Sequence, residues 1–222
     1  PVNSPYVVIP LNIFWDSAAF SLNDIFIYYD KWLLKTISFL LEECNIQVYV
    51  RQHPHERKFN TGKEVEKLLN RNFGDHKLYT FIDSHSDVNT YSLVQSSQLV
   101  LPNTSTVGLE AAMMGKQVIL KNDVYYANLG FCQKANDEHE YFHLIKEALS
   151  NPKELSKEQI ENAKYYFALT MNNSTKPFFG DCYEVKEWSS LELDTILENE
   201  SVKWLIDLIM NNKLLLENKL SI

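Results

Sequence analysis

Short apolar segments alternate with longer amphipathic segments along residues 6–120. The apolar segments are typical of buried strands: "YVVIPL" (6–11), "IQVYVR" (46–51), "LYTFI" (78–82), "QLVLP" (98–102) and "QVIL" (117–120). The intervening segments, 21–44, 63–73, 89–97 and 105–115, carry apolar residues at helical spacing. Parallel strands need helical crossovers and are buried on both faces. The alternation therefore predicts an α/β fold with a Rossmann-like, doubly wound parallel sheet.

Beyond residue 135 the pattern is helical. Helical spacing covers 137–150, 156–171 and 201–218, whereas 172–190 is rich in polar and turn residues and predicts a surface crossing. We therefore expect residues 1–171 to form the Rossmann-like domain. Residues 172–222 are expected to form the crossing segment and a helix that packs on the same domain.

The charge and cysteine content exclude several classes of protein. The net charge is -8 and no block of Lys and Arg accompanies the aromatic residues, which argues against a nucleic-acid-binding or anionic-membrane surface. Three cysteines without metal-like spacing favour a reducing cytosol over a disulfide framework. No apolar run is long enough to span a bilayer, and no signal peptide is visible. The chain starts at Pro1 rather than Met, so we expect a part upstream of it.

The first unusual polar stretch, "VRQHPHER" (50–57), lies at the carboxyl end of a predicted strand. Ligands of doubly wound sheets bind beyond these ends. Pro54 ends the strand and keeps His53 extended, which presents the imidazole at the rim, where it can donate to a phosphate oxygen. Alternation places Arg51 on the same side as His53. The alternative is an ordinary polar strand end.

The second stretch, "LVLPNTSTVGLEAAMMGKQVIL" (99–120), runs a strand into a hydroxyl-rich helix start. Thr104, Ser105 or Thr106 can cap the helix, and the three hydroxyls with the first helical amides form a candidate phosphate site. Glu110 lies one turn further along, where its carboxylate can accept bonds from both hydroxyls of a ribose. The alternative is a simple cap with Glu110 on a solvated face. Neither a Walker loop nor a dinucleotide fingerprint is present.

Taken together, "PLNIFWDSAAF", "VRQHPHE", "TSTVGLEAAMMGKQVI" and "YYANLGF" resemble the bacterial capsule-polysaccharide biosynthesis glycosyltransferases, which include Kdo transferases. The resemblance covers about residues 6–150 and implies the C-terminal, nucleotide-sugar-binding domain of a GT-B enzyme. It implies that His53 and the hydroxyls of residues 104–106 hold the nucleotide phosphate and that Glu110 holds the ribose. The "FIDSHSD" loop (81–87), with Ser84 and His85, would lie against the base. The N-terminal acceptor domain of such an enzyme is not recognisable here.

The resemblance also sets the expected chemistry. We expect a metal-independent glycosyltransferase that uses a nucleotide-sugar donor, with a CMP-sugar favoured over UDP- or GDP-sugars, and a glycan or glycolipid acceptor. Asp16 is a weak catalytic candidate, because a loop-capping role is commoner for Asp at such a position. No other cofactor and no metal site is expected. The expected location is the cytoplasm, with a peripheral position at the inner face of the membrane as a variant.

Two alternative functions stay open at this point. One is a phosphotransferase of the teichoic-acid type, which transfers a polyol phosphate from a CDP donor. The other is a non-catalytic nucleotide-binding module.

Overall fold

The computed structural model describes residues 4–13, 24–59, 62–174, 192–198, 202–203, 206–207 and 210–211. The chain divides into two compact units, Pro1–Lys164 and Tyr165–Ile222. The predicted domain boundary after residue 171 falls within helix α7 (Lys157–Ser174) and stays a prediction.

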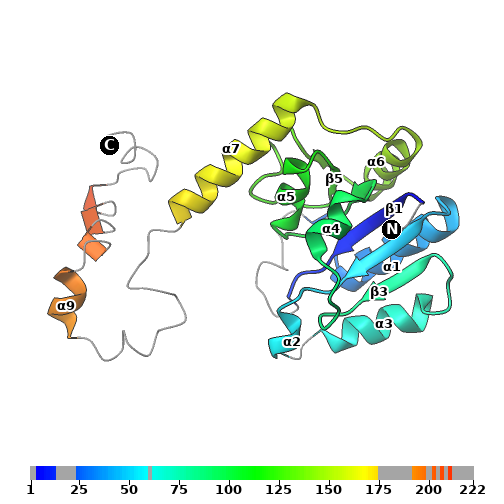
Figure 1. The fold of residues 1–222 in the computed structure, drawn as a ribbon, viewed down its shortest axis with the longest axis horizontal. Coiled ribbons are helices and arrows are strands. Elements are labelled where there is room, and N and C mark those ends of the chain that lie inside the picture. The colour runs from blue at the N-terminus through cyan, green and yellow to red at the C-terminus, as the bar shows by residue number, and fades with distance from the viewer. Residues whose placement is uncertain are drawn as a thin grey trace. The chain divides into compact units, whose positions relative to one another are not determined.

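The first unit contains a six-stranded sheet in the order β3-β2-β1-β4-β5-β6, flanked by helices (Figure 1). Every neighbouring pair of strands in this sheet is parallel. The strands are β1 (Tyr6–Pro10), β2 (Gln47–Arg51), β3 (Tyr79–Ile82), β4 (Leu99–Val100), β5 (Gln117–Leu120) and β6 (Gln133–Lys134). The predicted α/β class and the five predicted strands are confirmed. The sixth strand, β6, was not predicted.

The helices are α1 (Tyr29–Ser38), the π-helix η2 (Phe39–Glu43), α2 (Glu56–Phe59), α3 (Lys63–Phe73), α4 (Thr90–Gln95), α5 (Val107–Met113), α6 (Glu138–Ser150), α7 and α9 (Leu193–Glu198). The helices predicted over 63–73, 89–97, 105–115, 137–150 and 156–171 are confirmed, whereas the short helices at 56–59 and 193–198 were not predicted. Most of the crossing predicted at 172–190 and of the helix predicted at 201–218 lies outside the described residues.

The helix predicted over 21–44 begins only at Tyr29. The backbone N–H of Ile25 donates to the Lys121 carbonyl, and that of Phe26 donates to the Asp24 carboxylate. These two backbone N–H groups therefore do not make helical hydrogen bonds.

Strand β1 forms the centre of the sheet because it pairs with both β2 and β4. All five of its residues are buried, as expected for a strand covered on both faces. The main core joins strand residues to helices α1, α3 and α6. Its members include Val7, Ile9, Val48, Val50, Trp32, Leu33, Leu69, Tyr141 and Ile145.

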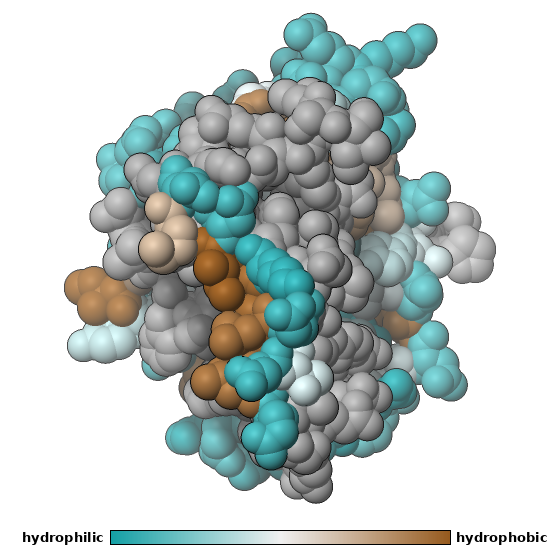
Figure 2. All heavy atoms as spheres, turned by 90° about the vertical axis from the view of Figure 1, so that its left-hand side faces the viewer, coloured by the Kyte–Doolittle hydropathy of each residue, from teal (hydrophilic) through white to brown (hydrophobic). Residues whose placement is uncertain are grey.

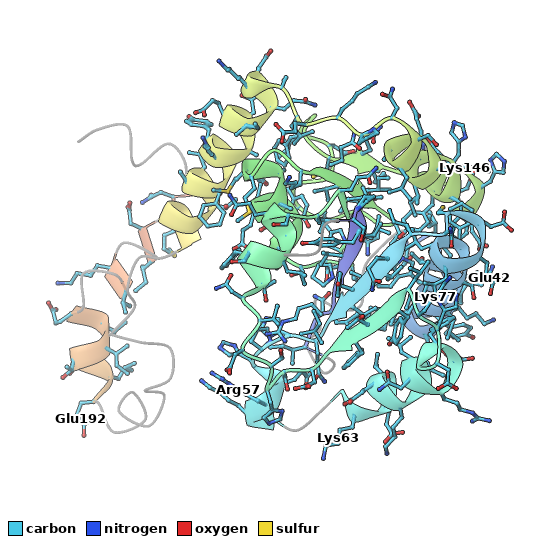
Figure 3. The ribbon with its side chains drawn as sticks, turned by 45° about the vertical axis from the view of Figure 1, so that its right-hand side comes forward. Glu42, Arg57, Lys63, Lys77, Lys146 and Glu192 are labelled. Carbon is cyan, nitrogen blue, oxygen red and sulfur yellow. The ribbon has the colours of Figure 1, made fainter. Side chains whose placement is uncertain are left out.

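The surface of the first unit carries charges of both signs. Figure 3 labels the exposed residues Glu42, Arg57, Lys63, Lys77 and Lys146. In the second unit, the described apolar side chains of Leu193, Leu197, Ile206 and Met210 are exposed. Figure 2 shows apolar side chains beside hydrophilic ones on the face it presents. Within the described residues, no helix is both long and apolar enough to cross a membrane.

Candidate functional site

The strand order places a crevice between β1 and β4. Strands β2 and β3 extend the sheet on one side of β1, and β4, β5 and β6 extend it on the other. In doubly wound sheets the connections diverge at such a switch point, and ligands bind outside the carboxyl ends of the strands there. Loops that follow β1 and β4 therefore border the candidate site.

Asn12 and Thr104 meet across this switch point. Asn12 follows β1, and its side-chain Nδ2 donates to the Thr104 hydroxyl at 2.9 Å. The Thr104 backbone N–H lies 3.5 Å from the Asn12 Oδ1 and donates to it. Asn12 therefore fixes the hydroxyl-rich turn in place, a role that the sequence did not indicate.

The turn before α5 is held largely by Ser105. Its Oγ accepts from the Val107 backbone N–H at 3.3 Å, and its carbonyl accepts from the Gly108 N–H and from the Tyr126 hydroxyl. Thr106 occupies the N-cap position, but its side chain makes no capping hydrogen bond and is exposed. Of the three hydroxyl residues, Ser105 thus bonds an N–H of the first turn, Thr104 bonds Asn12 and Thr106 faces outward.

Gly108 is required by packing inside the protein. A Cβ atom at this position would lie 2.3 Å from the Tyr126 hydroxyl and 2.9 Å from Pro102 Cγ. Tyr126 and Phe131 are buried, whereas Tyr125 is exposed. The space beside Gly108 on α5 is therefore filled by Tyr126 and Pro102.

Glu110 does not lie on a solvated helix face. The Tyr91 hydroxyl donates to its Oε1 at 3.3 Å, while its Oε2 is buried with no hydrogen-bond partner. Burial raises the pKa of the Glu110 carboxyl above its ordinary value, and the bond from Tyr91 acts in the opposite direction. Buried polar atoms in folded proteins are normally bonded, and perturbed carboxyls cluster at functional sites. Glu110 is therefore the described residue of this set that most clearly calls for an external donor.

His53 lies directly after β2, as predicted, with a partly buried side chain. Its Nδ1 accepts from the His55 backbone N–H at 3.1 Å. An accepting Nδ1 places the proton of the neutral ring on Nε2. The carbonyl of His53 accepts from the Glu56 N–H at the start of α2, which fixes the backbone beyond the strand.

Arg51 serves the neighbouring loop. Only 3% of the residue is exposed, and its guanidinium donates to the Asp83 carbonyl, to the Thr90 hydroxyl and to the Ser86 carbonyl. Burial lowers the pKa of the guanidinium, which the charge of Asp83 partly offsets. The sequence grouped Arg51 with the candidate nucleotide-binding residues, which stays a prediction; in the structure its donors hold the loop after β3.

That loop, residues 83–89, is anchored at two points by residues at the end of β2 and directly after it. Besides Arg51, the Gln52 side chain accepts from the Ser84 backbone N–H at 2.8 Å. Ser84 is buried, and the exposed His85 follows it, with its N–H bonded to the Asp83 carboxylate at 2.7 Å. The loop is thus positioned at the same edge as His53. Asp16, the weak catalytic candidate, lies outside the described residues.

Two polar pairs, one buried and one partly buried, fasten the loop after β5. Asn122 donates from Nδ2 to the Asn103 Oδ1 at 2.9 Å, which ties this loop to the one after β4. Lys121 is fully buried, pairs with Asp24 and lies 5.0 Å from the centre of the Trp32 ring. Burial lowers the pKa of Lys121 and its bond to Asp24 opposes that effect. No short sequence pattern marks any of these residues.

Other titratable candidates do not form a site. His139 and His143 are both exposed on α6. Burial raises the pKa of the Cys132 thiol to about 12, so this thiol is not an activated nucleophile. Across the ranges that the structure describes, no three His, Cys, Asp or Glu residues are placed to hold a metal ion.

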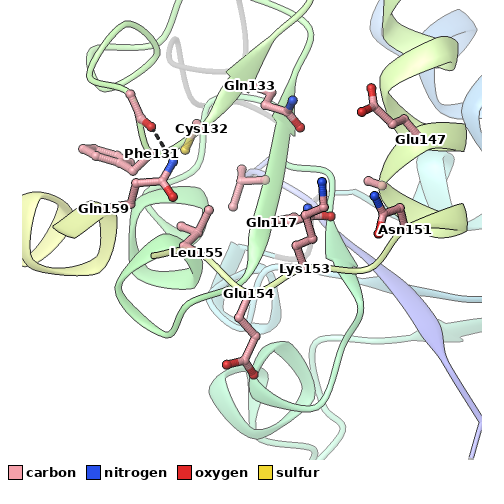
Figure 4. A pocket seen from close by; sticks show the side chains of 13 residues that line it. Gln117, Phe131, Cys132, Gln133, Glu147, Asn151, Lys153, Glu154, Leu155 and Gln159 are labelled. Atoms are coloured by element: carbon pink, nitrogen blue, oxygen red, sulfur yellow. Dashed lines mark hydrogen bonds between the residues drawn. The ribbon is translucent and has the colours of Figure 1, made fainter. Parts of the chain in front are cut away.

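A cavity of about 240 Å³ lies elsewhere in the first unit, beside the amino ends of β5 and β6. Its walls include Gln117, Gln133 and Asn151 (Figure 4). The strands run away from it, so it lies at the opposite edge of the sheet from Glu110 and His53. Cavities are often ligand-binding sites. For a nucleotide, however, the switch-point topology and the unpartnered Glu110 carboxylate oxygen favour the carboxyl edge of the sheet.

Comparison with known proteins adds a family and a fold. A family model described as capsule polysaccharide biosynthesis protein matches residues 1–168. No match is found among curated proteins.

Three solved structures show what the chain is similar to. A Thermosulfurimonas dismutans KpsC β-Kdo 2,4-transferase structure is 16% identical, with a TM-score of 0.47, over 73% of this chain and 44% of that one. The corresponding β-Kdo 2,7-transferase is 19% identical, with a TM-score of 0.45, over 73% and 45%. The UDP-GlcNAc 2-epimerase of Neisseria meningitidis, bound to UDP-GlcNAc, is 12% identical, with a TM-score of 0.51, over 78% and 46%. The epimerase supports the Rossmann-like fold, and the chain spans less than half the length of all three.

Proposed function

The chain belongs to the family of capsule polysaccharide biosynthesis proteins, and we propose that it is the donor-binding half of a glycosyltransferase. In this proposal it binds a nucleotide-activated sugar at the carboxyl edge of its sheet. The sugar is transferred to a growing surface polysaccharide, with a glycan or glycolipid as the acceptor.

One observation carries the proposal: Glu110 Oε2 is buried beside the switch point without a hydrogen-bond partner. A carboxylate held in this way lacks a donor, and a ribose diol supplies two hydroxyl donors to it. Tyr91 bonds the other oxygen, Oε1, and thereby fixes the orientation of the carboxylate. Glu110 is thus preorganised to accept from a sugar hydroxyl.

The phosphate end of the donor is proposed to lie between the β2 and β4 loops. His53 presents Nε2 as a donor, and the turn at residues 104–106 supplies hydroxyls and backbone amides. Negative charge grows on the nucleotide phosphate as the bond to the sugar breaks. Donors fixed in advance at that position stabilise the charge, with each typically contributing about 10² to 10³ in rate.

The base is proposed to lie against the loop of residues 83–89. Arg51 and Gln52 hold this loop from β2, so Arg51 acts as a positioning residue. The exposed His85, next to the buried Ser84, then faces the base.

The donor is proposed to be a CMP-linked acid sugar such as Kdo, with UDP- and GDP-sugars next. This order follows from the family resemblance of the sequence motifs. Binding without a divalent metal is also part of the proposal. His53 and the backbone amides donate hydrogen bonds to the phosphate and so stabilise the negative charge that a metal ion would otherwise stabilise.

Calorimetric titration of the chain with CMP, UDP, GDP and CDP, each with and without EDTA, tests the proposal. We expect CMP to bind most tightly and its affinity to be unchanged by EDTA. Loss of all nucleotide binding in EDTA would contradict the metal-independent site. Absence of binding in both conditions would contradict the proposed donor-binding function itself.

A further inference from the structure

The cavity at the amino ends of β5 and β6 is built from parts of the first unit that hydrogen bonds hold together. The segment before α7 is anchored by the Leu155 N–H, which donates to the Gly115 carbonyl at 2.9 Å. Gln159 Nε2 donates to the Gly130 carbonyl at 2.8 Å. Ser156 and Gln159 also bond each other's backbone N–H at the helix start. The cavity walls are therefore fixed before any ligand arrives.

The lining offers hydrogen-bonding groups above an apolar base. Gln117, Gln133 and Asn151 contribute side-chain amides, and Glu147 faces the same hollow from α6 (Figure 4). Val118 and Ala148 are buried and supply apolar surface. A side-chain amide both donates and accepts, which matches a hydroxyl group that does the same.

Gln117 gives the direct indication of a ligand. Its Oε1 is buried and has no hydrogen-bond partner, although the residue begins a strand and lines the cavity. A buried acceptor without a donor is unfavourable and is normally satisfied by protein, water or ligand. The wall of the cavity therefore holds a buried oxygen that needs a donor.

The charges around the cavity limit the class of ligand. Glu147 and Glu154 provide two carboxylates against the single ammonium of Lys153, so a phosphate or carboxylate ligand is disfavoured. A metal ion is not indicated, since the described residues contain no group of three His, Cys, Asp or Glu fit to ligate one. The volume of about 240 Å³ is below the range usual for drug-sized ligands. A small, uncharged, hydroxyl-rich molecule fits these limits.

We propose that this cavity binds one uncharged pyranose ring. A ring hydroxyl donates to Gln117 Oε1, the amides of Gln133 and Asn151 bond neighbouring hydroxyls, and a C–H face of the ring lies on Val118 and Ala148. The site is at the opposite edge of the sheet from Glu110. It does not depend on nucleotide binding.

Nuclear magnetic resonance of the ¹⁵N-labelled chain tests the proposal. D-glucose, D-galactose and N-acetyl-D-glucosamine are titrated separately while the side-chain amide signals of Gln117, Gln133 and Asn151 are followed. We expect at least one sugar to shift these signals saturably, with a Kd of roughly 1 to 10 mM, as suits a ligand of about a dozen heavy atoms. Glucuronate and glycerol should bind at least about tenfold more weakly, because one is charged and the other lacks a ring.

The key variant is Gln117→Leu, which should weaken sugar binding about fivefold or more. Gln47→Leu is the matched control, because Gln47 also begins a strand, β2, outside the cavity. Gln133→Ala provides a second variant should Gln117→Leu fail to fold. A titration with maltotriose tests whether the cavity also accepts a pyranose ring at the end of a glycan or only a free monosaccharide.

Three outcomes would overturn the proposal. They are the absence of saturable shifts up to 100 mM of all three sugars, equal shifts with glycerol, and unchanged affinity in folded Gln117→Leu and Gln133→Ala. The first would mean that water alone satisfies Gln117 Oε1. Because the readout follows cavity signals without nucleotide, its failure is separate from failure of the proposed donor-binding function.

Discussion

Asn12 and Thr104 are 92 residues apart in sequence, yet the Asn12 amide donates to the Thr104 hydroxyl at 2.9 Å. The bond joins the loops after β1 and β4, the two strands that meet at the switch point of the sheet. It therefore sets the position of the turn that carries Ser105 and leads to Glu110.

Replacing Asn12 with Ala should loosen this turn. We expect CMP affinity to fall severalfold and the free energy of unfolding to fall by about 1 kcal/mol, the usual contribution of one such bond. Calorimetry and urea unfolding measure the two effects. Asn70→Ala on the exposed face of α3 is the control. Unchanged CMP affinity in Asn12→Ala would show that the turn holds its place without this bond.

Arg51→Lys should disturb the loop after β3 while it keeps the positive charge. A lysine ammonium cannot reproduce the fork of donors that contacts Asp83, Ser86 and Thr90. We expect a loss of about 1 to 3 kcal/mol in stability and faster hydrogen exchange across residues 83–90. Exchange rates equal to those of the wild type would mean that Gln52 alone is enough to hold the loop.

His53→Ala should weaken nucleotide binding and leave nucleoside binding almost unchanged, because the proposed partner of His53 is phosphate. A charge-assisted bond of this kind contributes roughly 1.5 to 3 kcal/mol, or about ten- to a hundredfold in affinity. CMP and cytidine titrations give the comparison, with His55→Ala as the neighbouring control. Equal losses for CMP and cytidine would assign His53 to the scaffold.

Glu110→Gln should change how stability depends on pH. Burial raises the folded-state pKa of Glu110, so the folded protein binds more protons than the unfolded chain between the ordinary and the raised pKa. Stability from this group is therefore present at low pH and is lost as pH rises through that window. We expect Glu110→Gln to unfold at a higher temperature than the wild type at pH 7, and the gap to close as the pH falls below about 4.5. If the difference in unfolding temperature between the two proteins does not depend on pH, the Glu110 carboxylate is not desolvated in the folded protein.

The sequence predicted the parts of the fold that have a local signal. Strands such as β2 and β5 contain short apolar runs, and α3 has a clear helical period, so each was found. Strand β6 consists of two polar residues, and only its pairing with β5 makes it a strand. The start of α1 was placed too early because Asp24 and Ile25 bond to Lys121, nearly a hundred residues away.

The candidate site shows the same division. His53 and the 104–106 turn stand at strand ends that the sequence marks with Pro54 and a hydroxyl cluster. Asn12 carries no local mark, and strand alternation placed Arg51 beside His53 without revealing the carbonyls that its guanidinium contacts. Long-range hydrogen bonds decide these roles, and a single sequence does not encode them in any short pattern.

The most direct test of the account compares CMP with 2′-deoxy-CMP in the wild type and in Glu110→Gln by calorimetry. An ionised carboxylate accepts from both diol hydroxyls, whereas an amide keeps one acceptor oxygen. We predict that the wild type prefers CMP and that Glu110→Gln loses most of this preference, a difference of about 1 to 2 kcal/mol, with the fold intact by melting temperature. The same discrimination in both proteins would contradict ribose binding by Glu110.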